Sequence, residues 1–300
     1  MSKKKIGIVR GGTGEHYQKS LNKGGDLIVY ILENLYPKWT PVDVFIDQEG
    51  VWHVSGFPVL PSDLAQRVDV VWNTVPGASS TIDTLGIPKI ETEALHQLLE
   101  EERDRLRDHM ETLDITMPRS LILSSYISDT DGDVQEYATK KAQEVFGKFA
   151  PPWIVRSVSG KVSMGVHVAK TFPELVNAII DGIEHRGNIL VEELIPGKPV
   201  SLHTLREFRG EDVYHFPLPR SLSEDEKKII TDFGEELFES LGVKHYMKTD
   251  LVLSPTRGVS LLGISFMPDW RDSSHFADLC SQVGAKPVHV FENLLKRVFK

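Results

Sequence analysis

The first third of the chain alternates short apolar runs with amphipathic stretches. Apolar runs of strand length lie at 5–9, 41–46 and 68–72, and a stretch with helical spacing follows the first of them up to about residue 35. Strands that alternate with helices indicate an open parallel sheet, which binds ligands at the carboxyl ends of its strands. We therefore predict a Rossmann-like α/β domain at 1–93, with a small hairpin or a loop at 51–61.

The remaining two thirds carry a different pattern, in which helices are mixed with pairs of neighbouring strands. The longest helical spacing covers 92–113, where leucines and one methionine recur on one face and the charged residues form a solvated face. Strand pairs are predicted at 153–169 and 200–216, and the polar segment 124–133 is predicted to be a loop. These elements indicate an α+β region, which we divide into a linking helix with a central subdomain at 94–198 and a C-terminal subdomain at 199–300.

A hairpin predicted at 247–266 contains the acid Asp250 in its first strand. The residues between its strands include Pro255 and Gly258, which favour a turn. An acid within an apolar strand is costly unless it is paired or binds a metal. The second strand is expected to be buried and has Gly263 where a second acid could stand. Asp250 is therefore a candidate metal ligand, and the alternative is an ion pair with one of three nearby cations, Lys244, Lys248 or Arg271.

Composition narrows the class of protein. A formal net charge of −9 argues against a nucleic-acid binder. No apolar run approaches the roughly 20 residues that a membrane helix needs. The single cysteine, Cys280, excludes an internal disulfide and fits a reducing compartment. We expect a soluble, cytoplasmic protein.

Six segments, taken in chain order, resemble the D-alanine–D-alanine ligases of the ATP-grasp superfamily: IGIVRGGTGEHYQKSL, IVRSVSGKVSMGV, ILVEELIPG, KTDLVL, SLLGISFMP and, in its spacing, FADLCSQVGAKPVHVFENLL. The resemblance rests on their order over nearly the whole chain. It implies a pre-ATP-grasp domain followed by a two-part ATP-grasp fold, a homodimer formed through the N-terminal domain, and a role in making peptidoglycan precursors. It also implies a reaction in which ATP phosphorylates a carboxylate and an amine then attacks the acylphosphate.

The resemblance assigns roles by position in these segments. Glu15 would bind the ammonium of the first amino acid and act in catalysis, Ser274 would contact the carboxylate of the second substrate, and Lys248 would take the place of the arginine at the oxyanion. The residues that would bind ATP are Arg103, Arg156, Lys161, Ser163, Glu192, Leu194 and Ile195. Mg²⁺ would be held by Asp250, with help from Asp269 or Asp272.

The chain also departs from the family pattern. Arginines stand at 103 and 156, where the family has lysines, and Gly263-Ile264-Ser265 replaces the Glu-x-Asn of the second metal strand. Losing one of two carboxylates removes a full charge from a site whose chemistry is electrostatic. Two functions therefore remain open, a divergent ligase and a non-catalytic descendant that binds a nucleotide or small ligand or serves as a scaffold.

Simpler roles exist for several of these residues. Glu15 is also well placed to stabilise a helix N-terminus, and Arg156 is equally well explained by an ion pair. Glu192 and Glu193 alternate across a strand, so at most one of them faces the site, and the other is expected to be solvated.

Overall fold

The computed structural model describes residues 4–14, 16–158, 164–185, 188–271 and 273–299. The chain divides into two compact units, each built from separate stretches. Unit 1 comprises 1–100, 202–249 and 264–300, and unit 2 comprises 101–201 and 250–263. The division into domains at 1–93, 94–198 and 199–300 stays a prediction.

A mixed sheet with the strand order β4-β3-β2-β1-β5-β6 opens unit 1. Its strands are β1 (Lys4–Gly11), β2 (Trp39–Ile46), β3 (Trp52–Val54), β4 (Phe57–Val59), β5 (Val70–Asn73) and β6 (Lys89–Glu91). The four strands β2, β1, β5 and β6 run parallel, and β3 and β4 add an antiparallel hairpin at the edge. The predicted open parallel sheet and its hairpin are therefore confirmed.

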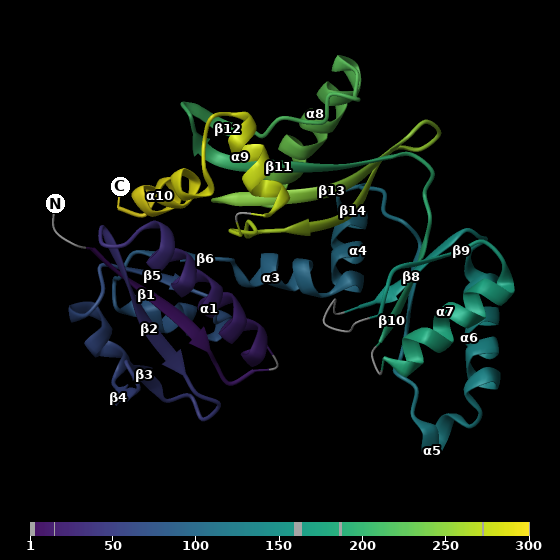
Figure 1. Ribbon diagram of the computed structural model, residues 1–300, viewed down its shortest axis with the longest axis horizontal. Coiled ribbons are helices and arrows are strands. Elements are labelled where there is room, and N and C mark those ends of the chain that lie inside the picture. Colours follow the sequence, from purple (N-terminus) through teal and green to yellow (C-terminus); the bar gives the residue numbers. More distant parts are fainter. Residues whose placement is uncertain (1–3, 15, 159–163, 186–187, 272, 300) are drawn as a thin grey trace. The chain divides into compact units, whose positions relative to one another are not determined.

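Each face of this sheet is covered by helices, because side chains alternate along its buried strands. Ile6 and Ile8 of β1 belong to one core with Leu27 of α1 (Tyr17–Asn34). Val9 belongs to the opposite core with Ile82 of α2 (Ser79–Thr84), beside the short turns η1 (Pro61–Gln66) and η2 (Pro76–Ala78). Figure 1 shows α1 lying along one side of these strands.

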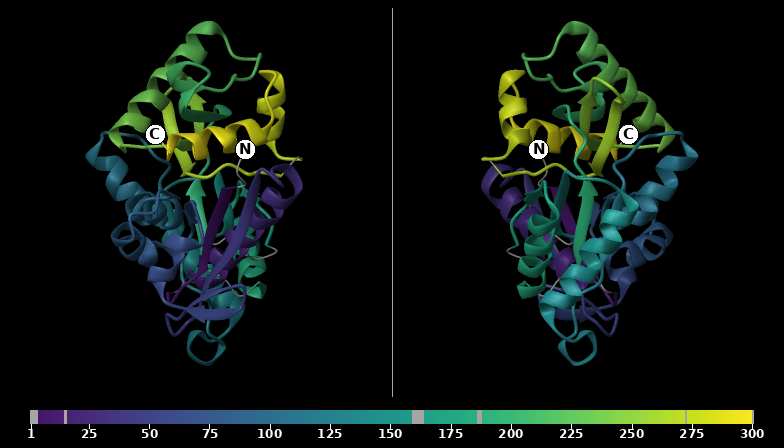
Figure 2. Two further views of the ribbon diagram at one scale, coloured as in Figure 1. Left: turned by 90° about the vertical axis from the view of Figure 1, so that its left-hand side faces the viewer. Right: turned by 90° about the vertical axis from the view of Figure 1, so that its right-hand side faces the viewer.

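A second sheet, ordered β12-β11-β13-β14, places most of its residues in unit 1. Its strands are β11 (Lys198–Phe208), β12 (Glu211–His215), β13 (Tyr246–Ser254) and β14 (Gly258–Ser265). Leu202 packs on Gly234 of α8 (Glu224–Ser240), whereas His203 stacks on Phe276 of α9 (His275–Gln282). The two helices therefore cover opposite faces (Figure 2). The predicted hairpins are confirmed, and α9 was not predicted.

Unit 2 contains an antiparallel sheet with the order β7-β10-β8-β9. Its strands are β7 (Ser120–Leu123), β8 (Trp153–Ser157), β9 (His167–Ala169) and β10 (Ile189–Glu193). Two helices, α6 (Val134–Lys148) and α7 (Phe172–Glu184), pack their apolar residues with those of the sheet into one core. The pairing of β8 with β9 confirms the predicted hairpin. The segment predicted to be a loop contains a short helix, α5 (Ser128–Asp131).

The prediction of one continuous helix at 92–113 is wrong. It consists of two helices, α3 (Ala94–Glu101) and α4 (Arg103–Thr112), because Glu102 is extended at φ −110° and ψ 102°. No glycine or proline marks the break, and the boundary between the two units falls at this point. The helical spacing therefore continues through a position where the chain passes from one unit to the next.

Candidate functional site

Two arginines from different elements of unit 2 meet at one carboxylate. Arg103 begins α4 and donates from Nη2 to Oε1 of Glu192 at 2.6 Å. Arg156 of β8 donates from Nη2 to Oε2 of the same side chain at 3.0 Å. Arg156 pairs with Leu190 across the sheet, so Glu192, two residues further along β10, has its side chain on the same face. The sheet register and the start of α4 thus bring together three of the predicted ATP-binding residues.

Arg103 is the most buried member of this group. Its Nη1 donates to the carbonyl oxygen of Leu262 on β14, and burial lowers the pKa of its guanidinium below the ordinary value although Glu192 opposes this. The Nε of Arg103 is buried and has no hydrogen-bond partner among the described residues. A buried cation with an unused donor is suited to an additional anionic ligand.

Arg107 was missed by the sequence analysis. It lies one turn after Arg103 on α4 and donates from Nη2 to Oγ of Ser120, which is opposite Glu192 in the sheet register. Its positive charge also lowers the pKa of Arg103. The spacing of four residues along one helix was the available signal, since it places two arginines on one face. We call Arg103, Arg107, Arg156 and Glu192 the arginine cluster, and its formal charge is positive.

Glu193 occupies the opposite face of β10, and the expectation that it is solvated is wrong. Its carboxylate is buried and is bound by Arg257 at 2.6 Å and by Arg119 at 3.1 Å. The hydrogen bond from Arg257, followed by that from Arg119, lowers the pKa of Glu193 to about 2. The strand therefore buries both neighbouring acids, each between two arginines.

Asp250 is half-buried on β13, which corrects the expectation of a buried acid. It accepts a hydrogen bond at Oδ1 from Oγ of Ser201. Gly263 of β14 has open space where a side chain would begin, because a Cβ there would meet no atom within 4 Å. The second strand is only partly buried, so the expectation of a fully buried strand is also wrong. A single carboxylate thus stands where the resemblance expects two.

The remaining predicted site residues that the structure describes lie in separate local environments. Lys248 is half-buried on β13, and Asp269 forms an ion pair with Arg271 that lowers the pKa of its carboxyl. Ser274 caps α9 by accepting from the backbone N–H of Ala277. Leu194 donates its backbone N–H to Pro152, and Ile195 is buried. Four predicted residues lie outside the described ones: Glu15, Lys161, Ser163 and Asp272.

A cavity of about 310 Å³ opens in unit 1 at the carboxyl ends of β1 and β5. Its walls include the glycine-rich turn from Gly11 to Gly14 and the segment from Val75 to Ala78. Gly12 has a φ of +103°, and a Cβ there would lie 2.7 Å from a methyl group of Val75, so glycine is required for this close approach. This is the edge at which the sequence predicted a ligand.

In the ranges that the structure describes, no group of three or more His, Cys, Asp or Glu side chains could hold a metal ion. Within the same ranges, no helix is long and apolar enough to cross a membrane.

Comparisons of the sequence find distant relatives along nearly the whole chain, although no protein-family model matches. The D-alanine–D-alanine ligase of Oceanobacillus iheyensis is 22% identical, with 98% of this chain and 94% of the relative covered. That of Phocaeicola vulgatus is 20% identical, with 99% of this chain and 100% of the relative covered.

Solved structures of such ligases have a similar fold. The D-Ala:D-Ser ligase VanG from Enterococcus faecalis matches with a TM-score of 0.66 and 18% identity, over 99% of this chain and 100% of that one. The Bacillus anthracis ligase in complex with ATP matches with a TM-score of 0.64 and 15% identity, over 99% and 97%. The predicted fold class is thus confirmed. The chain is thus similar in sequence and in fold to D-alanine–D-alanine ligases over nearly its full length.

Proposed function

We propose that the chain is a divergent ATP-dependent carboxylate–amine ligase of the D-alanine–D-alanine ligase type. ATP would transfer its γ-phosphoryl group to the carboxylate of a first amino acid, giving ADP and an acylphosphate. The amine of a second amino acid would then displace phosphate and form the amide. The observation that carries the proposal is the convergence of Arg103 and Arg156 on Glu192, at the positions where the family has its phosphate-binding lysines.

The arginine cluster has the positive charge that binding the phosphates of a nucleoside triphosphate requires. Two guanidinium groups share the Glu192 carboxylate, so one positive charge remains in excess there. Arg107 lies one turn further along α4 and pairs with Asp104. Each guanidinium can bind two phosphate oxygens through parallel hydrogen bonds from its planar fork, a geometry that an ammonium lacks. Because catalysis in such ligases consists of positioning and charge neutralisation, arginines can replace the family's lysines. Glu192 would release them when the nucleotide enters and would turn to the nucleoside.

Mg²⁺ would be held by Asp250 and by the phosphate oxygens of the nucleotide. This ion accepts one or two carboxylates when phosphate oxygens and water complete its octahedron, so one acid fits a metal that arrives with ATP. Lys248, two residues before Asp250 on the same strand, has its side chain on the same face and would stabilise the developing negative charge. Ser274 and Glu15 would bind the two amino acids.

A non-catalytic descendant is the second candidate, and two observations favour it. Glu192 already accepts hydrogen bonds from both guanidinium groups, so a phosphate must displace a buried carboxylate. Gly263 supplies no second acid for Mg²⁺. Such a protein would bind a nucleotide or a small ligand, or would act as a scaffold, without turnover.

Calorimetric titration of ATP with and without Mg²⁺ tests the nucleotide site, and phosphate release in the presence of D-alanine tests turnover. The ligase proposal predicts Mg²⁺-dependent binding and release that Asp250→Asn abolishes. Binding without release supports the non-catalytic candidate. If ATP does not bind at millimolar concentration, both the ligase and the non-catalytic nucleotide-binding protein are contradicted. If Asp250→Asn releases phosphate as fast as the wild type, the assignment of Asp250 as a metal ligand is contradicted.

A further inference from the structure

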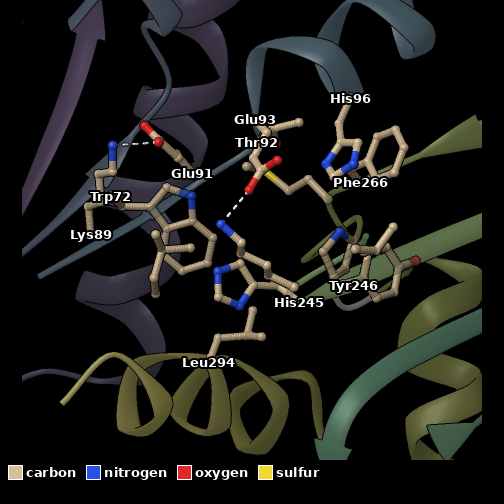
Figure 3. Close-up of a pocket in the computed structure, with 15 residues that line it drawn as sticks. Trp72, Lys89, Glu91, Thr92, Glu93, His96, His245, Tyr246, Phe266 and Leu294 are labelled. Atoms are coloured by element: carbon tan, nitrogen blue, oxygen red, sulfur yellow. Dashed lines mark ion pairs between the residues drawn. The ribbon is translucent and has the colours of Figure 1, made fainter. Parts of the chain in front are cut away.

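Unit 1 contains a second, more enclosed cavity that the proposed reaction does not use. Its volume is about 100 Å³, and its walls come from β5, β6 and the segment after β6, from α3, from the segment that leads into β13, from the segment that follows β14 and from α10 (Pro287–Arg297). Figure 3 shows the side chains that surround it, among them Trp72, Glu93, His245 and Phe266. The space is large enough for several heavy atoms of a ligand.

Trp72 presents an unused donor to this cavity. The residue is 2% exposed, and its indole Nε1 is buried without a hydrogen-bond partner in the described part of the chain. Its ring is held by stacking on Phe291 at 4.7 Å between centroids, so the donor direction is fixed. In Figure 3 the indole nitrogen lies on the edge of the ring that is turned toward Glu93. A buried N–H without a partner calls for an acceptor at that place.

His245 supplies a second unused polar atom on another wall. Its Nδ1 is buried and has no partner among the residues that the structure describes. Burial, with the positive charges of Arg297 and Lys244, lowers the pKa of this imidazole to about 4, against the opposing effect of Glu93 and Glu91. The ring is therefore neutral near pH 7 and can make one further hydrogen bond as a donor or an acceptor.

The charged residues of the lining are two lysines and two glutamates, so their formal charges cancel. Lys89 and Glu91 form a fixed pair at 2.7 Å, because Asn73 and Ser79 also bind the Glu91 carboxylate. Lys244 and Glu93 pair at 2.6 Å but are 71% and 42% exposed. Since an exposed ion pair contributes little to stability, a ligand with both charges can separate these two groups at small cost.

We propose that this cavity binds a small zwitterion, an α-amino acid with a short apolar side chain. Its carboxylate would accept from the Trp72 N–H and pair with Lys244, and its ammonium would pair with Glu93. Its side chain would lie on the apolar part of the lining, which includes Ile90, Phe266 and Leu294. A net-neutral lining with one separable pair of charges favours a zwitterion over a simple anion or cation.

The indole N–H signal of Trp72 in a nitrogen–proton correlation spectrum reports directly on this site. The chain has five tryptophans, and Trp72→Phe identifies the signal. Added alanine should shift that signal with a saturable, millimolar dependence, because so small a ligand makes few contacts. Propionate and ethylamine, which each carry one of the two charges, should bind at least about tenfold more weakly.

Substitutions of the exposed pair test the assignment without disturbing the core. Lys244→Met and Glu93→Gln should each weaken alanine binding by about tenfold, whereas Lys38→Met, which breaks a comparable surface pair with Glu292, should leave it unchanged. Asp250→Asn should also leave it unchanged, which separates this site from the ligase reaction. No shift of the Trp72 signal with alanine overturns the proposal. An equal shift with propionate also overturns it. A nuclear Overhauser effect from the Trp72 N–H to long-lived water that alanine does not displace overturns it as well, because the cavity would then hold water only.

Discussion

Each face of strand β10 carries a glutamate that is bound by two arginines, and the two sets of arginines differ in their exposure to solvent. Glu192 and Glu193 are adjacent, and each accepts hydrogen bonds from two arginines. The side chains of Arg103 and Arg156 are 8% and 36% exposed, whereas those of Arg119 and Arg257 are 57% and 44% exposed. The two arginines of Glu192 are thus the more buried, and the difference is greatest at Arg103.

Burial decides what each pair can do. An exposed ion pair is screened by water and adds little stability, so the Glu193 face joins Arg119 before β7 to Arg257 of the β13–β14 turn without offering a site. A buried guanidinium must keep an anionic partner, since leaving it alone is costly. Arg103 can satisfy this need with Glu192 or with a phosphate. In the proposed function, a phosphate of ATP would replace this carboxylate.

The largest expected effect is on stability, and it compares the two faces directly. Arg103→Met should lower the free energy of unfolding by about 3 kcal/mol, because Glu192 loses its buried partner and Leu262 loses a donor. The matched change Arg119→Met should cost clearly less, because solvent screens that ion pair. Urea denaturation of both variants measures the difference, and equal losses would contradict the distinction between the faces.

A pH titration of stability addresses the Glu193 face. The pKa of Glu193 is lowered to about 2, so its contribution to stability is present above its ordinary pKa and is lost as the pH falls from about 4.5 toward 2. Because both arginine partners are half-exposed, solvent screening limits this contribution to about 1–2 kcal/mol.

Glu193→Gln should flatten the stability curve in that pH window, and Arg257→Met should flatten it partly. Denaturation at a series of pH values measures this. A variant curve parallel to that of the wild type would show that the carboxyl has no depressed pKa.

Substitutions at Arg156 test whether the buried face exchanges its carboxylate for a phosphate. Arg156→Met should weaken ATP binding by about tenfold, and Arg156→Lys by only a few-fold, because lysine keeps the charge but loses the two-pronged contact. Calorimetry at two salt concentrations measures the affinities, which should fall as salt rises. Arg257→Met is the matched control on the other face, and an equal loss there would mean that the effect is not local.

The smallest effect on stability is expected at Gly263. A Cβ there meets no atom within 4 Å, so Gly263→Glu should change the free energy of unfolding by no more than about 1 kcal/mol. The new acid should strengthen the Mg²⁺ dependence of ATP binding, while Gly263→Ala should not. If the two variants bind ATP and Mg²⁺ alike, the missing acid is not what limits the metal.

The sequence predicted the strands well because burial leaves a periodic pattern. The parallel sheet of unit 1 and three hairpins were readable from alternating apolar residues and from turn residues such as Pro255 and Gly258. The break at Glu102 was not readable, because an extended residue between two good helices needs no glycine or proline. Its cause lies in the division of the chain into two units, which is not a local property.

The site was predicted in part, for a related reason. The family resemblance predicted Arg103, Arg156 and Glu192 as ATP-binding residues. In the structure these three side chains contact one another. Arg107 and the burial of Glu193 were missed, since both depend on pairing between residues far apart in the chain. The periodicity of apolar residues shows which face of a helix or strand is buried. It does not show which charged residue from another element lies against that face. The substrate roles of Glu15 and Ser274 stay predictions.

Formation of a dipeptide from D-alanine and ATP tests the central claim most directly. The account predicts that the wild-type protein with Mg²⁺ releases one phosphate for each dipeptide formed, and that Arg103→Lys retains more of this activity than Arg103→Met. Binding of ATP without any dipeptide or phosphate, across a panel of small D-amino acids, would contradict it and would leave a nucleotide-binding protein without turnover.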